Sequence, residues 1–272
     1  MAPVRPRERE EGHFHVHLTG FGPFRNYTIN PSWEAVRPLN ETLLSGPPAP
    51  LNSATSLDPP SESASSHRPI RLTASLLPVK YTSALSMVPA LHARAKPDFC
   101  PDLIIHVGVG LEGAVRLEQS ARKVGYEKPD ADGEMAPVDE KTGRKGHVGA
   151  ELKELAAELR TRIDGQRVVN WVRGKGLEHV ELSEDAGLYL CEFTYFASLV
   201  AALRQNPSHP LPVQFIHVPP YVASRFAKII VTIPAHHDLL PRTEAPYSIE
   251  QLTRAIQLLV WAIVNEGGLS SS

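Results

Sequence analysis

Near its middle the sequence reads Leu103-Ile104-Ile105-His106-Val107-Gly108, a nearly continuous apolar run that stops at a glycine. A run of this kind is expected of a strand that helices cover on both faces, as in a parallel sheet. The run therefore predicts a buried central strand. Similar short strand patterns occur at residues 14–18, 70–77 and 215–218.

Helix patterns separate these strand patterns. Ser32 suits the start of a short helix, and Ser248 with Gln251 forms a capping-box pattern ahead of a terminal helix. Strands that alternate with helices predict a single α/β domain with a mainly parallel sheet. The other helices are expected over residues 83–95, 148–163 and 191–204.

The expected organisation is one domain with a tail and two insertions. Residues 1–12 are polar and charged and are interpreted as a flexible tail, which leaves 13–272 for the domain. Residues 45–66 are rich in Pro and Ser and contain few large apolar groups, so they contribute little to a core. Residues 221–247 show no clear period, and we interpret both segments as insertions.

Composition excludes several classes of protein. The 272 residues are 42% hydrophobic, enough for a substantial core, and the formal net charge is −2, so neither nucleic acid nor a membrane is expected as a partner. The N-terminal residues lack the apolar core of a signal peptide, and the most apolar stretch, 256–264, is too short to span a bilayer. A cytoplasmic location is therefore expected. The sequence does not indicate an oligomeric state.

The chain contains two cysteines, Cys100 and Cys191, too few for a disulfide framework or a zinc site built on thiolates. We expect both to be reduced, and Cys100 to be a packing residue ahead of the apolar run. The triplet His236-His237-Asp238 is a weak metal-site candidate, because adjacent side chains diverge. No metal and no other cofactor is expected.

A glycine-rich segment, Gly108-Val109-Gly110-Leu111-Glu112-Gly113, follows the central strand. It matches the pattern of a dinucleotide-binding loop, in which glycines let the backbone approach a pyrophosphate at a helix N-terminus. Its place in mid-chain and the carboxylate of Glu112 argue against that function. The other interpretation is a loop that shapes a cleft.

Three residues could together perform nucleophilic catalysis. Cys191 begins a predicted helix, where the helix dipole favours a thiolate, although a buried and inert cysteine is the commoner case. His217 could accept the thiol proton and deliver one to a leaving amine, or it could be a hydrogen-bonded core histidine. Glu118 could hold a histidine tautomer, or it could be a solvated charge.

Four blocks of sequence, taken in order, resemble one family. The first strongly resembles the opening of pyroglutamyl peptidase I enzymes, and the others follow in the order found in that family. Four ordered blocks are far more specific than any one, and the version here is closer to eukaryotic members than to bacterial ones. The blocks are Thr19-Gly20-Phe21-Gly22-Pro23-Phe24 with Asn30-Pro31-Ser32-Trp33-Glu34-Ala35-Val36, then His106-Val107-Gly108 with Glu118, then Asp185-Ala186-Gly187 to Cys191, and Phe215-Ile216-His217-Val218-Pro219-Pro220.

The resemblance implies a three-layer α/β/α sandwich with a mainly parallel, twisted sheet, and a Cys–His–Glu triad. At the matching positions, Cys191 would attack the pyroglutamyl carbonyl and His217 would be the general base. Glu118 would orient His217. The expected reaction is hydrolysis of the amide bond after an N-terminal pyroglutamyl residue, through a thioester acyl-enzyme. Such an enzyme is a cysteine exopeptidase, also called an omega-peptidase.

The resemblance also implies where the substrate lies. Phe21 and Phe24 would flank the five-membered lactam ring, since a small, flat, uncharged group suits aromatic faces. Asn30 and the backbone of Val109 are assigned to the same site. Two alternatives stay open: a non-catalytic protein that binds pyroglutamyl-capped N-termini, and a nucleotide-binding oxidoreductase that uses the glycine-rich loop.

Overall fold

The apolar run around Ile105 forms strand β4 (Leu103–Val109), the middle strand of a seven-stranded sheet. The computed structural model describes residues 12–24, 29–51, 67–93, 99–220 and 247–269. Six of the seven residues of β4 are buried, as expected for a strand covered on both faces. The prediction of a buried central strand is confirmed.

The sheet is mainly parallel, which confirms the predicted class. β4 pairs in parallel with β1 and with β9, β1 pairs in parallel with β3, and β5 pairs in parallel with β8. Two contacts are antiparallel: β2 against β3, and β5 against β9. The strand order is β2 (Thr42–Leu44), β3 (Ile70–Leu77), β1 (Phe14–Phe21), β4, β9 (Val213–Val218), β5 (Val115–Glu118) and β8 (Val180–Ser183).

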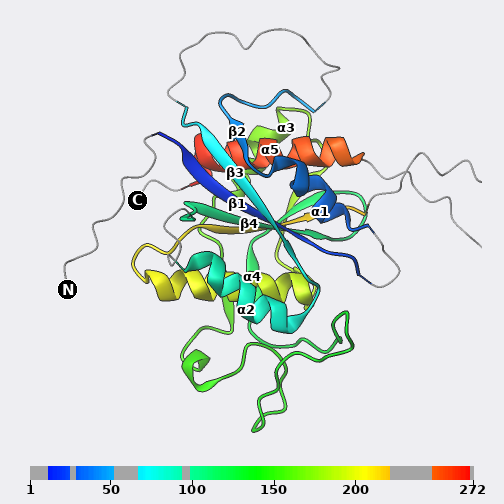
Figure 1. Cartoon of the computed structure of the whole chain (residues 1–272), viewed down its shortest axis with the longest axis vertical. Coiled ribbons are helices and arrows are strands. Elements are labelled where there is room, and N and C mark those ends of the chain that lie inside the picture. The colour runs from blue at the N-terminus through cyan, green and yellow to red at the C-terminus, as the bar shows by residue number, and fades with distance from the viewer. Residues whose placement is uncertain (1–11, 25–28, 52–66, 94–98, 221–246, 270–272) are drawn as a thin grey trace, which may run out of the picture.

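Helices cover both faces of this sheet, so the three-layer sandwich is also confirmed. On one face lie α1 (Pro31–Val36), α3 (Gly165–Arg173) and α5 (Ile249–Asn265), around a core that includes Trp261. On the other lie α2 (Tyr81–His92) and α4 (Leu190–Gln205), around a second core that includes Phe193. Figure 1 shows the two groups of helices above and below the sheet.

Two helix starts were predicted from side chains that accept backbone hydrogen bonds. At α5 the capping box is present as predicted, with Ser248 and Gln251 each bonded to the other's backbone. At α1 the prediction was wrong by two residues, because Asn30 is the N-cap and accepts the Ser32 N–H. Pro31 occupies the first helical turn, where its missing N–H costs nothing.

The helix predicted over 148–163 does not form. The segment holds a short 3-10 turn, Ala150–Leu152, and strand β7 (Glu158–Arg160), which pairs with β6 (Ser120–Arg122). Gly149 has a φ of 140°, which breaks a right-handed helix at its start. The helix comes later, as α3, where Asp164 caps the first turn and the sequence analysis had placed none.

Several expectations concern residues that are not described. The tail at 1–12, apart from its last residue, and most of the insertions at 45–66 and 221–247 lie outside the described residues, as does the triplet at 236–238. Among the residues that are described, no helix has the length and apolarity that crossing a membrane requires.

Gly20 lets α1 lie directly on strand β1. A Cβ atom at this position would stand 2.6 Å from the Trp33 Cα and 2.8 Å from the Ser32 carbonyl oxygen. These are backbone atoms, which cannot move aside as the end of a side chain can. The close approach brings the start of α1 against the end of β1, next to Phe21.

We expect Gly20→Ala to lower the free energy of unfolding by about 1–3 kcal/mol, the usual cost of overpacking. The matched control is Gly46→Ala, because a Cβ atom there would meet nothing within 4 Å. Urea unfolding of both variants measures the difference. Equal stability of the two would contradict the steric account of Gly20.

Candidate active site

The candidate site lies where three parallel strands end side by side. β1 ends at Phe21, β4 at Val109 and β9 at Val218, one residue after His217. In an open α/β sheet the carboxyl ends of parallel strands form the edge at which ligands bind. The fold thus brings together residues from three of the four sequence blocks.

Strand β5 brings Glu118 to His217. Because β5 runs antiparallel to β9, Glu118 pairs with Phe215 across the two strands, and its side chain lies beside the ring of His217. The His217 Nδ1 and the Glu118 Oε1 are 2.7 Å apart, with side-chain exposures of 8% and 0%. Glu118 is a buried strand residue, so the alternative of a solvated helix charge is wrong.

Cys191 faces the other side of the same imidazole. It is the second residue of α4 and is partly exposed, and its sulfur lies close enough to His217 to raise the pKa of the ring. Cys100, in contrast, is exposed, so the expectation of a packing role was wrong. The neighbouring Phe99 makes the packing contact instead, with its ring 4.8 Å from that of His17.

His217 has a raised pKa. Burial by itself lowers this pKa, but the charge and hydrogen bond of Cys191 and the hydrogen bond and charge of Glu118 oppose burial and raise it from 6.5 to about 9. At neutral pH the ring therefore holds a proton, with Cys191 and Glu118 as its two partners. A positive imidazolium beside a sulfur nucleophile is the arrangement that activates cysteine for acyl transfer.

The side chains of Cys191 and His217 fill the space beside the glycines of the glycine-rich loop. A Cβ atom on Gly108 would lie 2.9 Å from the Cys191 sulfur, and one on Gly110 would lie 2.7 Å from the His217 Cβ. The chain then continues into β5 with no intervening helix, so there is no helix N-terminus to receive a pyrophosphate. The loop makes room for the candidate catalytic residues, and the dinucleotide-loop interpretation is wrong.

Aromatic rings lie next to His217 and to the segment before Cys191. Phe21 is buried, with its ring centroid 6.4 Å from that of Phe215, which itself packs against His217 at 4.9 Å. Phe24 is half-buried and lies 5.6 Å from the ring of Tyr189, two residues before the nucleophile. The two phenylalanines thus make separate ring contacts within one hydrophobic core, Phe21 on the side of His217 and Phe24 on the side of Cys191.

Asn30 holds the loop that carries these phenylalanines. Its side-chain oxygen accepts the Ser32 N–H and hydroxyl, and its amide nitrogen donates to the Gly22 carbonyl oxygen at 2.9 Å. The Ser32 hydroxyl oxygen in turn accepts the Phe21 N–H at 3.0 Å. Asn30 thus fixes the backbone around Phe21. Val109 is half-buried at the end of β4, between the two close glycines.

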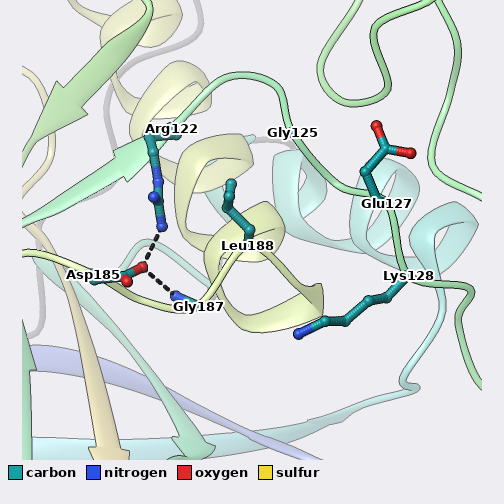
Figure 2. Close-up of a pocket in the computed structure, with 7 residues that line it drawn as sticks. All are labelled: Arg122, Gly125, Glu127, Lys128, Asp185, Gly187 and Leu188. Atoms are coloured by element: carbon teal, nitrogen blue, oxygen red, sulfur yellow. Dashed lines mark hydrogen bonds and ion pairs between the residues drawn. The ribbon is translucent and has the colours of Figure 1, made fainter.

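Two charged residues near Cys191, Arg122 and Glu192, were not predicted from the sequence. Glu192 follows Cys191, and its 1%-exposed side chain pairs with Arg122 at 2.7 Å. In the sequence, Glu192 could be noticed only as a carboxylate next to the candidate nucleophile. Its partner Arg122 lies 70 residues away and forms no sequence pattern with it. Arg122 lies at a hollow of about 280 Å³, and Figure 2 shows it with the other lining residues, Gly125, Glu127, Lys128, Asp185, Gly187 and Leu188.

The described part of the chain contains no group of three or more His, Cys, Asp or Glu side chains that could hold a metal ion. Within those residues, Cys191, His217 and Glu118 form a cluster whose chemistry is suited to catalysis.

Comparison with known proteins gives consistent matches along the sequence. The chain is 28% identical over 251 residues to pyroglutamyl-peptidase 1 of Mus musculus and of Homo sapiens, covering 90% of this chain and 87% of each relative. It is 27% identical over 206 residues to a pyrrolidone-carboxylate peptidase of Yersinia pestis, covering 75% of this chain and 77% of that protein. No protein-family profile matches the chain.

Solved structures share the fold over nearly the whole chain. Pyroglutamyl peptidase I of Bacillus amyloliquefaciens matches with a TM-score of 0.64 at 21% identity, covering 93% of this chain and 97% of that one. A mutant pyrrolidone carboxyl peptidase of Pyrococcus furiosus matches with a TM-score of 0.63 at 19% identity, covering 92% and 98%. The chain is therefore a relative of the pyroglutamyl peptidase I enzymes in sequence and has their α/β fold.

Proposed function

We propose that this protein is a cysteine exopeptidase that hydrolyses the amide bond after an N-terminal pyroglutamyl residue. The observation that carries the proposal is the placement of Cys191 beside His217, which is in turn hydrogen-bonded to the buried Glu118. Relatives that match nine-tenths of the chain bear the name of this activity. Its substrates are then peptides with an N-terminal pyroglutamate.

In the first half of the reaction the Cys191 sulfur attacks the pyroglutamyl carbonyl carbon and forms a tetrahedral intermediate. The imidazolium of His217 gives its proton to the departing amine as the carbon–nitrogen bond breaks, which leaves a thioester on Cys191. In the second half, neutral His217 takes a proton from water, whose oxygen attacks the thioester. Free pyroglutamate leaves, and the proton on His217 restores the starting state.

Glu118 keeps the imidazole ready for both steps. Its carboxylate accepts a hydrogen bond from the Nδ1–H of His217 without taking the proton. The Nε2 atom is then the one that faces the sulfur, the leaving amine and the water in turn. The start of α4 supplies backbone N–H groups near Cys191, which can stabilise the oxyanion.

The aromatic rings of Phe21 and Phe24 suit the lactam. We assign Phe21 and Phe24 to the faces of the ring and the backbone of Val109 to its amide, while Asn30 contributes through the loop that it holds. A cytoplasmic location is part of the proposal, because a thiolate nucleophile needs a reducing environment and both cysteines are free.

The experiment is release of a fluorescent amine from a pyroglutamyl amide in reducing buffer, with proline and glutamine amides as specificity controls. We expect selective release from the pyroglutamyl amide. Cys191→Ser should abolish it, since a serine hydroxyl is not ionised by this site. His217→Ala should lower the rate by about 10²–10⁴-fold, the usual contribution of a positioned acid–base group.

Cys100→Ser is the matched control, because it removes the exposed thiol and leaves the site untouched. It should retain full activity and full inhibition by iodoacetamide. A folded protein that binds pyroglutamyl peptides without releasing amine would overturn the enzyme proposal in favour of a binding protein. Retained turnover in Cys191→Ser would exclude this nucleophile.

The pH profile tests the role of Glu118. The pKa of His217 is raised to about 9, so the imidazolium form is present below that pH and is lost as pH rises through it. We therefore expect kcat/KM to fall on the alkaline side near pH 9. Glu118→Gln removes a charge that raises this pKa, so the alkaline limb should move to lower pH.

Glu112→Gln is the control for this measurement, because Glu112 is an exposed carboxylate in the nearby loop. Its pH profile should match that of the unaltered protein. An alkaline limb that stays in place in Glu118→Gln would show that Glu118 does not tune His217.

A further inference from the structure

The residue that follows the nucleophile, Glu192, has a buried carboxylate that forms an ion pair with the partly exposed Arg122. The Glu192 Oε1 accepts the Arg122 backbone N–H at 2.8 Å and the Arg122 Nε–H at 2.7 Å. The Oε2 accepts the Arg122 Nη2–H at 2.8 Å and the Leu188 backbone N–H at 2.7 Å. The carboxylate thus accepts four hydrogen bonds, and two of them form a bidentate contact with the guanidinium.

These bonds hold a backbone turn that side chains rarely adopt. Gly187 has a φ of 96° and Leu188 a φ of 46°, and the latter is one of the few non-glycine residues with a positive φ in the described part of the chain. A left-handed conformation costs a leucine free energy, so surrounding contacts must maintain it. The bond from the Leu188 N–H to Glu192 is such a contact, three residues before Cys191.

The same guanidinium also reaches the beginning of the turn. Arg122 pairs with Asp185, which accepts the Gly187 N–H at 3.1 Å. Figure 2 shows Arg122 pointing at Asp185, with Gly187 bonded to the same carboxylate. Arg122 on β6 therefore contacts Asp185 at the beginning of the segment before Cys191. Through Glu192 it also supports Leu188, near the end of that segment.

Charge adds a second effect to this positioning. A buried carboxylate next to Cys191 would disfavour a second negative charge on the sulfur, because like charges repel strongly away from water. Arg122 compensates that carboxylate at hydrogen-bonding distance. Removing Arg122 alone would leave Glu192 both buried and uncompensated, which is costlier than removing the pair.

We propose that Arg122 and Glu192 are positioning residues for the reaction: together they fix the turn before Cys191 and keep the surroundings of its sulfur electrically balanced. This inference rests on the proposed function. It does not place either residue in contact with substrate, and it predicts that the pair acts through Cys191.

The test measures the rate of iodoacetamide alkylation of Cys191 against pH, in a Cys100→Ser background where Cys191 is the single thiol. Alkylation reports thiolate formation without requiring peptidase activity, so this test can fail independently of the proposed function. The variants are Arg122→Met, Glu192→Gln and the double variant. Arg37→Met, which breaks an exposed ion pair on α1, is the matched control. Circular dichroism establishes that each variant is folded.

We expect Arg122→Met to move the alkylation profile to higher pH and to lower kcat by about 10²-fold with little change in KM. Adding Glu192→Gln should restore about tenfold of that loss, a coupling typical of residues in one network. Glu192→Gln alone should move the profile to lower pH. Arg37→Met should leave both measurements unchanged.

Two results would overturn the proposal. One is an unaltered alkylation profile in folded Arg122→Met. The other is a double variant as impaired as Arg122→Met, which would mean that the pair only stabilises the fold. If Arg122→Met does not fold, Glu192→Gln decides, because an unchanged profile in that variant would contradict the electrostatic balance.

Discussion

The hydrogen bond between the His217 Nδ1 and the Glu118 Oε1 is the contact on which the site depends. It requires a carboxylate and an imidazole to be buried together, which is unfavourable unless each satisfies the other. The protonated ring of His217 interacts with the Glu118 carboxylate on one side and with Cys191 on the other. Under the proposed function, the nucleophile, the acid and the orienting group are thereby fixed at the carboxyl ends of the strands before any substrate binds.

The direction of one strand makes that contact possible. β5 reverses the parallel order of the sheet, and its last residue lies beside the end of β9. The two glycines at the end of β4 leave space above the sheet, which the nucleophile and the histidine fill. His217 and Glu118 are therefore positioned by strand ends, and Cys191 is positioned by the start of α4, in the space that the two glycines leave.

Local patterns predicted the elements that local forces determine. The buried run at β4 and the capping box of α5 appear in the structure as the sequence predicts. The wrong helix at 148–163 had the right apolar spacing, but Gly149 and the pairing of β6 with β7 overrode it. The triad residues could be named from ordered blocks, whereas the meeting of Glu118 with His217 depends on sheet pairing. The pairing of Arg122 with Glu192 joins positions 70 residues apart and has no local signature.

The most direct test of the account is a search for the covalent intermediate. The protein would be mixed with a pyroglutamyl amide, quenched in acid during turnover, digested and analysed by mass spectrometry. The account predicts the added mass of one pyroglutamyl group on the peptide that contains Cys191, and its disappearance when the substrate is exhausted. Steady release of amine with no added mass on that peptide, under conditions in which the thioester survives the quench, would contradict nucleophilic catalysis by Cys191.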